Sequence, residues 1–362
     1  MTDGSIPASI NRRMMLRGLG LGALGLSLGP LVGCAARNSL SFANWDSHIG
    51  ETTLADFKDA SGIDTTLSVI ASEDALIDQL QQRGEVPDLI IASNRMVERL
   101  AAAGLLAPLS HARIPNLRNL DPRFADASYD PGRKFSAPYT WLVYGIGYRK
   151  SAVKAPPKGW KDLFANPAYA GRIALPADPA KLFRIAARTL GKGPNAIAAA
   201  DVPVLADLLK AKLPRIKAFH TDDGQDLLLG RQVDLVADFN GDLAQVILED
   251  PDLAFVMPEE GSELTCDNLC IPKGASVAEN AHLFIDFVLG GQAGSGICET
   301  ILYPTPNLAA KAMMAAEYRD SPVLFPSAEL LARCDYARWK PDLDQAINQA
   351  WEGLRQPLNK PG

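Results

Sequence analysis

The sequence is poor in the residues on which catalysis and metal binding most often depend. Its 362 residues include four histidines and five cysteines, and no histidine stands at ligand spacing from another histidine or from a cysteine pair. From residue 34 onward the HExxH, GxSxG, CxxC and P-loop patterns are all missing. The acidic residues are scattered rather than paired in an acid–base motif. The sequence therefore predicts neither an enzyme nor a protein with a metal or an organic cofactor.

An excess of basic charge is missing as well. Lysine and arginine total 36 against 42 aspartates and glutamates, which gives a formal net charge of −6. Nothing supplies the long-range positive field that a nucleic acid partner requires. The charge balance excludes nucleic acid as the expected partner, and it permits a small cationic ligand without requiring one.

Residues 1–33 are predicted to be an export signal. Arg12 and Arg13 precede an uncharged run, 18–33, that is shorter than the roughly 20 apolar residues needed to cross a bilayer. The arginine pair, followed by Leu16, resembles a twin-arginine signal, although the basic end of an ordinary secretory signal is the alternative. Leu31-Val32-Gly33-Cys34 is similar to a bacterial lipobox. Lipidation of Cys34 would make the protein an exported, membrane-anchored periplasmic lipoprotein.

Four cysteines follow Cys34 and leave the redox state open. They are Cys266, Cys270, Cys298 and Cys334. An exported chain with an even number of cysteines permits disulfides. Cys266 and Cys270 lie in an apolar stretch expected to be a strand, where about 13 Å separates them, too far for a bond between the two. We expect free or structural cysteines.

Short apolar runs alternate with amphipathic stretches along the rest of the chain. Strands are predicted at 39–43, 65–70, 88–92, 142–148, 172–175, 233–238, 253–257 and 264–271. Helices are predicted at 54–60, 74–82, 96–103, 181–190 and 201–213. This alternation is typical of an α/β fold with mainly parallel strand pairing.

Seven short motifs follow one another along this α/β region. They are FANW at 42–45, PDLIIAS at 87–93, PYTW at 138–141, IGY at 146–148, WKDLF at 160–164, FNGD at 239–242 and YPTPN at 303–307. In this order they resemble the spermidine/putrescine-binding proteins of bacterial ABC transporters, over residues 39–355. The resemblance implies a type II periplasmic-binding-protein fold with a ligand cleft between two lobes. Lobe 1 would comprise 39–142 plus 267–309, and lobe 2 would comprise 143–266 plus 310–355.

The resemblance also implies which residues contact the ligand. They are Trp45, Asp46, Ser93, Asp178, Phe239, Asp242 and Asp267. His48 is assigned to the ligand as well, although it stands where the family typically has a second aromatic residue. An ammonium group that leaves water loses several kcal/mol of hydration, which carboxylates and aromatic faces can offset. The alternatives are core packing for Trp45 and helix capping for Asp178, which directly precedes a proline.

Other positions depart from the family pattern. Arg95 stands where a tyrosine is common, Lys181 where a glutamate binds an amine, and Thr265 where the family has a tryptophan. Two cations in the cleft would repel a long polyamine, unless they pair with a carboxylate of the ligand or point outward.

The predicted function is that of a monomeric solute-binding lipoprotein that captures a polyamine or related small amine for an ABC transporter permease. Two alternatives stay open. One is a zwitterionic, amino-acid-like ligand, and the other is a sensor subunit that presents its ligand to a signalling receptor.

Overall fold

The computed structural model describes residues 38–82 and 85–355, so the predicted signal 1–33 and Cys34 lie outside the described residues. The strands are β1 (Ser39–Asn44), β2 (Asp64–Val69), β3 (Leu89–Ser93), β4 (Ser136–Arg149), β5 (Ile173–Pro176), β6 (Ile216–His220), β7 (Leu235–Phe239), β8 (Leu253–Val256), β9 (Glu263–Cys270) and β10 (Asp335–Tyr336). The longer helices are α2 (Thr53–Ser61), α3 (Glu73–Gln81), α4 (Asn94–Ala102), α7 (Pro179–Thr189), α8 (Val202–Lys212), α10 (Asn240–Glu249), α11 (Ala278–Val288), α12 (Gly291–Ile301) and α16 (Pro341–Arg355). The shorter helices are α5 (Pro122–Ala125), α6 (Trp160–Ala165), α9 (Gly224–Leu229), α13 (Leu308–Met313), α14 (Ala316–Arg319) and α15 (Ala328–Leu331).

The strands and helices predicted from the sequence are all present, and the α/β class is confirmed. Most boundaries move by one or two residues, whereas β4 begins at Ser136, six residues before the predicted start. The strand order is β2-β1-β3-β9-β4-β7-β5-β6, with β10 beside β9 and β8 beside β4.

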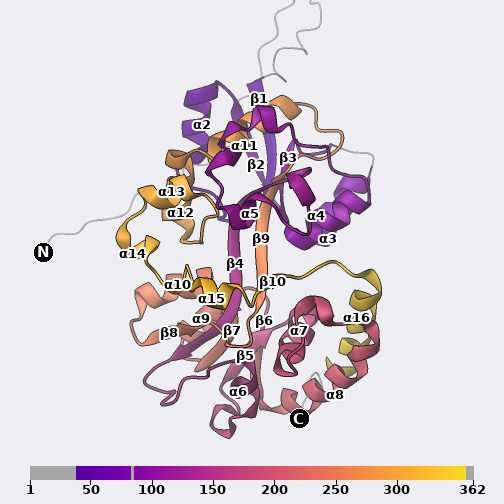
Figure 1. Cartoon of the computed structure of the whole chain (residues 1–362), viewed down its shortest axis with the longest axis vertical. Helices are drawn as coiled ribbons and strands as arrows, with labels where there is room; N and C mark the ends of the chain where they lie inside the picture. The colour runs from indigo at the N-terminus through magenta and orange to yellow at the C-terminus, as the bar shows by residue number, and fades with distance from the viewer. Residues whose placement is uncertain (1–37, 83–84, 356–362) are drawn as a thin grey trace, which may run out of the picture.

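Strand pairing is parallel within each half of the sheet and antiparallel where the halves join. β1 pairs in parallel with β2 and β3, and β5 pairs in parallel with β6 and β7. The prediction of mainly parallel pairing is wrong for β4 and β9, which are antiparallel to each other and to the strands beside them, β7 and β3. The two long strands run in opposite directions because one leads from the upper half of the molecule to the lower and the other leads back (Figure 1).

β4 belongs to both halves of the sheet. Its residues 136–143 pair with β9, and its residues 144–148 pair with β7. All 14 residues of the strand are buried, as expected for a strand covered on both faces. The fold is thus the two-lobe α/β arrangement. The residue boundaries predicted for lobes 1 and 2 stay a prediction.

Each half has an apolar core of its own. The upper core contains Phe284, whose ring lies 4.9 Å from that of Phe57 and 5.4 Å from that of Phe42. The lower core surrounds Trp160 and Phe183, both fully buried. Two separate cores let the halves behave as packed units that are joined by a few segments of chain.

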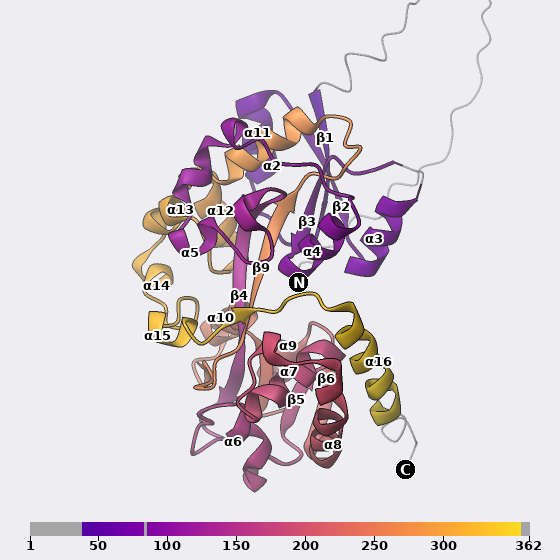
Figure 2. The ribbon, with the colours of Figure 1, turned by 45° about the vertical axis from the view of Figure 1, so that its right-hand side comes forward.

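A third segment passes between the halves near the C-terminus. β10 pairs with β9, and the chain then crosses to α16, which lies beside α7 and α8 of the lower half (Figure 2). Ile347 and Trp351 of α16 are buried in the lower core. This crossing brings the start of α16 close to α4 of the upper half.

The four cysteines after Cys34 are buried and free. Burial raises the pKa of the Cys266 thiol to about 11, so this thiol stays protonated and unreactive at neutral pH. Among residues 38–82 and 85–355, no helix combines the length and the hydrophobicity that a membrane crossing requires. Within the same residues, no cluster of three histidine, cysteine or acidic side chains could hold a metal ion.

Candidate functional site

A cavity of about 460 Å³ is lined by both halves of the molecule. All eight residues that the sequence assigned to the ligand line it: Trp45, Asp46, His48, Ser93, Asp178, Phe239, Asp242 and Asp267. The structure therefore brings together residues that lie more than 200 positions apart. That each of them contacts a ligand stays a prediction.

Strand ends place most of these residues. Trp45 follows β1, Ser93 ends β3, Asp178 lies two residues after β5, and Phe239 ends β7. In an open α/β sheet, ligands bind outside the carboxyl ends of the parallel strands. The cavity lies at that edge in both halves.

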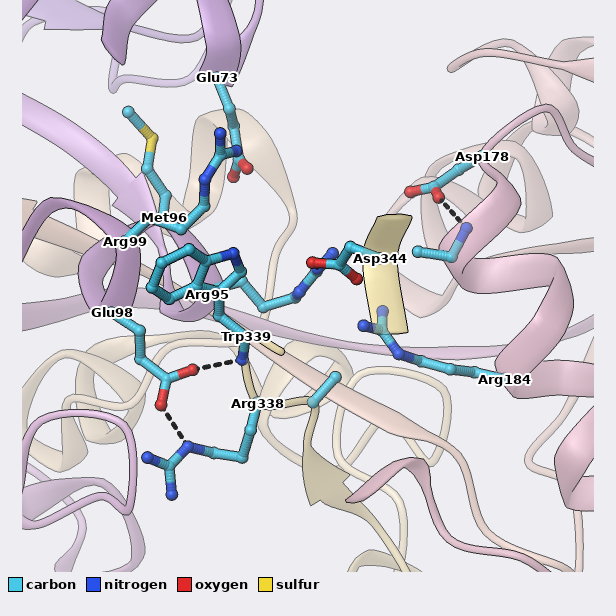
Figure 3. A network of polar contacts seen from close by, with 12 residues as sticks. Glu73, Arg95, Met96, Glu98, Arg99, Asp178, Arg184, Arg338, Trp339 and Asp344 are labelled. Atoms are coloured by element: carbon cyan, nitrogen blue, oxygen red, sulfur yellow. Dashed lines mark hydrogen bonds and ion pairs between the residues drawn. The ribbon is translucent and has the colours of Figure 1, made fainter. Parts of the chain in front are cut away.

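Ser93 and Asp178 are helix caps as well as cavity residues. The Ser93 hydroxyl accepts a hydrogen bond from the Met96 amide at 3.2 Å and donates one to the carboxylate of Glu73. Asp178 accepts hydrogen bonds from the amides of Ala180 and Lys181 at 2.8 and 3.2 Å. Figure 3 shows Asp178 at the start of α7. The capping interpretation of Asp178 is confirmed, and its side chain still lines the cavity.

Asp267 is an acid without a permanent cationic partner. Its Oδ2 lies 3.6 Å from Nε2 of His48 and 3.5 Å from Oγ1 of Thr140. Burial, reinforced by the charge of Glu73, raises the pKa of Asp267 to about 7, although hydrogen bonds from Trp45 and Thr140 oppose the rise. Burial also lowers the pKa of His48 to about 4, so this imidazole is neutral at pH 7 and cannot neutralise the carboxylate.

A second buried acidic group lies at the N-terminal end of α10. The Tyr303 hydroxyl donates a hydrogen bond to Oδ1 of Asp242. Burial raises the pKa of Asp242 and of neighbouring Asp238 above the usual range. Repulsion from Asp222 adds to the rise at both, and repulsion from Asp238 adds to it at Asp242. Oδ2 of Asp238 is buried and has no hydrogen-bond partner among the described residues. The lower half thus also holds carboxylates whose ionisation a bound cation would favour.

Seven further cavity residues were not assigned to the ligand or singled out from the sequence. They are Glu73, Asn94, Leu142, Arg184, Asp222, Glu263 and Tyr303. Tyr303 is the first residue of the YPTPN motif, so the motif was visible although its contact with Asp242 was not. Glu73 and Asp222 each closely follow a strand, at the same edge of the sheet. The remaining acid, Glu263, is paired with Arg184 at 3.1 Å.

Arg95 and Lys181 both line the cavity, so the alternative that they point outward is wrong. The guanidinium of Arg95 is directed at the carboxylate of Asp344, 2.5 Å away on α16 (Figure 3). This ion pair joins the upper half to the C-terminal helix of the lower half. Lys181 instead lies over aromatic rings, with Nζ 4.5 Å from the ring centroid of Phe239 and 5.1 Å from that of Tyr144.

The Arg95–Asp344 pair is expected to stabilise the contact between the halves. Its side chains are only 21% and 22% exposed, so solvent screens the interaction weakly. A double-mutant cycle with alanine at each position should give a favourable coupling of about 1 kcal/mol in urea unfolding.

The exposed Arg99–Asp74 pair within the upper half is the matched control, since the Asp74 side chain is 79% exposed. Its coupling should stay below about 0.5 kcal/mol. Equal couplings for the two pairs would contradict the interpretation.

Comparisons with known proteins agree with this geometry. The family model for bacterial extracellular solute-binding proteins matches residues 52–326. A spermidine/putrescine-binding periplasmic protein of Haemophilus influenzae is 29% identical, over 90% of this chain and 89% of its own length. A putrescine-binding periplasmic protein of Escherichia coli is also 29% identical, over 94% of this chain and 97% of its own.

A solved structure agrees with the fold. The substrate-binding protein of a spermidine/putrescine ABC transporter from Streptococcus pneumoniae superposes with a TM-score of 0.81 at 27% identity. The match covers 88% of this chain and 98% of that one. Because the family model spans well over half of the sequence, the chain belongs to the bacterial extracellular solute-binding proteins.

Proposed function

We propose that the protein captures a polyamine outside the cytoplasm and delivers it to an ABC transporter permease. The observation that carries the proposal is a pair of carboxylates in a cavity with aromatic walls: Asp242, which is buried, and Asp267, whose side chain is only 12% exposed. Neither forms an ion pair with a lysine or arginine within the described parts of the chain. Burial of an ionised carboxylate is unfavourable unless a cation compensates it, and an ammonium group of a ligand supplies that cation.

The charge of the cavity lining supports a cationic ligand. Seven carboxylates line the cavity, from Asp46, Glu73, Asp178, Asp222, Asp242, Glu263 and Asp267, against three basic side chains, Arg95, Lys181 and Arg184. Arg95 and Arg184 already have carboxylate partners in Asp344 and Glu263. The lining therefore has an excess of negative charge. The role is binding rather than catalysis, in line with the family of solute-binding proteins to which the chain belongs.

Capture and release would follow from movement of the two halves. A ligand that contacts residues from both halves binds the closed arrangement better than the open one, and so shifts the protein towards closure. The division proposed for this movement is 39–142 plus 267–309 against 143–266 plus 310–355. The sensor alternative needs the same closure, with a signalling receptor in place of the permease.

Export and anchoring belong to the same proposal. The relatives named above are periplasmic by name, and the sequence adds a twin-arginine-like signal and the lipobox that ends at Cys34. We infer a monomer held at the membrane by a lipid on Cys34. A Cys34→Ala variant expressed in a bacterial host should leave the membrane fraction, and unchanged fractionation would contradict the anchor.

Calorimetry of the purified protein with putrescine and spermidine tests the binding function. At least one polyamine should give saturable binding with one ligand per chain. The uncharged diol 1,4-butanediol, which matches putrescine in length, should give no heat. A panel of amino acids tests the zwitterionic alternative. If neither polyamine binds, the proposed function is wrong.

A further inference from the structure

Lys181 lies where an amine ligand would be expected to bind. Its ammonium is over the rings of Phe239 and Tyr144, at 4.5 and 5.1 Å from their centroids. Aromatic faces attract cations, and in an amine site they serve this purpose for the ligand. Here it is the ammonium of Lys181, not that of a ligand, that contacts the two rings. The residue is held in place at its backbone as well, because its amide donates to the cap residue Asp178.

The charge of Lys181 is shared among several acids of the cavity. Burial raises the pKa of Asp242 and Asp267, and the positive charge of Lys181 opposes the rise in both. It acts in the same sense on Asp222 and Asp238. Lys181 forms no ion pair with any residue that the structure describes, so it is a common counterion rather than one half of a pair. Because its charge already acts on these four acids, Lys181 needs no carboxylate from a ligand to balance it.

Of the acids that line the cavity, Asp242 and Asp267 are the two that we assign to the ammonium groups of a ligand. A chain of contacts connects them: the Tyr303 hydroxyl donates to Asp242, the Tyr303 ring lies 5.3 Å from the ring of His48, and His48 Nε2 lies 3.6 Å from Asp267. The two carboxylates thus lie at the two ends of one wall. An ammonium at each end accounts for a ligand with two positive charges.

We propose that Lys181 replaces one ammonium group of a longer polyamine, so that the cavity selects a linear diamine over a triamine. The inference rests on the proposed function and assigns its substrate class. A third ammonium of the ligand would approach the ammonium of Lys181 inside the cavity, where like charges repel. The same arrangement disfavours a zwitterionic ligand, whose carboxylate would face the excess of acids in the lining.

The test compares affinities for putrescine, spermidine and 4-aminobutanoate by calorimetry. The wild type should bind putrescine at least tenfold more tightly than either of the others. Lys181→Met, which keeps the apolar stem and removes the charge, should reduce the preference for putrescine over spermidine by about tenfold. Lys181→Arg, which keeps the charge, should retain the preference and serves as the matched control.

Each result has a definite meaning. A putrescine-to-spermidine ratio that is the same in Lys181→Met and wild type overturns the inference and leaves the proposed function standing. Tighter binding of spermidine or of 4-aminobutanoate by the wild type also overturns it. Absence of binding by all three ligands refutes the proposed function itself, a result distinguishable from the other two.

Discussion

Asparagine in place of Asp267 is expected to weaken polyamine binding by roughly 2–5 kcal/mol, or about 30-fold to several-thousand-fold. The substitution keeps the shape of the side chain and removes the charge that a ligand ammonium would meet. The neighbouring imidazole of His48 is neutral at pH 7 and offers no replacement for that charge. Calorimetric titration of putrescine into both proteins measures the difference.

A stability measurement separates loss of binding from loss of fold. Because burial raises the pKa of Asp267 to about 7, the ionised carboxylate is unfavourable in the unliganded protein. The Asp267→Asn variant without ligand should therefore be at least as stable to urea as the wild type at pH 7.5. Asp207→Asn, at an exposed position on α8, is the control and should change neither property. Affinity within twofold of the wild type in Asp267→Asn would remove Asp267 from the site.

The fold followed from sequence patterns that act locally. Val233–Asp238 is a short, mainly apolar run between helical stretches, so β7 could be placed to within two residues. Whether neighbouring strands pair in parallel or antiparallel was harder to predict from the sequence. β4 and β9 are apolar runs like those of the parallel strands, and nothing in their composition shows that they cross between lobes in opposite directions. The antiparallel pairing of β4 with β9 follows from the path of the chain between the lobes, which local patterns do not show.

The site could be predicted where residues match a family motif, and not where they depend on tertiary contacts. Trp45 and Asp242 belong to short motifs, and the structure places both in the cavity. The ion pair of Arg95 with Asp344 joins residues 249 positions apart, in a segment that no motif marked. The position of Lys181 over Phe239 likewise depends on how α7 packs against the sheet. Sequence identified both cations as departures from the pattern, and only the geometry shows what each contacts.

Polyamine affinity is expected to rise steeply as the pH increases from 6 to 8. A carboxyl with a pKa of about 7, as Asp267 has, is about one-tenth ionised at pH 6 and about nine-tenths at pH 8. Because an ammonium ligand binds the ionised form, Asp267 alone accounts for roughly a tenfold gain over this range. Asp242 and its neighbour Asp238, whose pKa values are also raised, should add to the gain.

The same pKa shifts affect the stability of the unliganded protein in the opposite direction from its affinity for the ligand. For an acid whose pKa is raised from 3.8 in the unfolded chain to about 7 in the folded protein, stability falls as the pH rises through that interval. His48 acts in the other direction, because its pKa falls from 6.5 to about 4 and stability is gained between those values. The contribution of His48 ends near pH 6.5. Above that pH the acids with raised pKa values determine whether stability rises or falls with pH.

Calorimetry at pH 6, 7 and 8 in two buffers of different ionisation enthalpy measures both the affinity and the protons released on binding. Proton release near pH 7 should accompany the rise, because the ligand lowers the pKa values of the carboxyls that it contacts. Asp267→Asn should reduce both the increase of affinity with pH and the number of protons released on binding. Asp207→Asn is the control and should change neither. His48, which faces Asp267, stays neutral between pH 6 and 8, because burial lowers its pKa to about 4. A flat affinity profile without proton release would therefore mean that ligand ammonium groups do not meet these carboxylates.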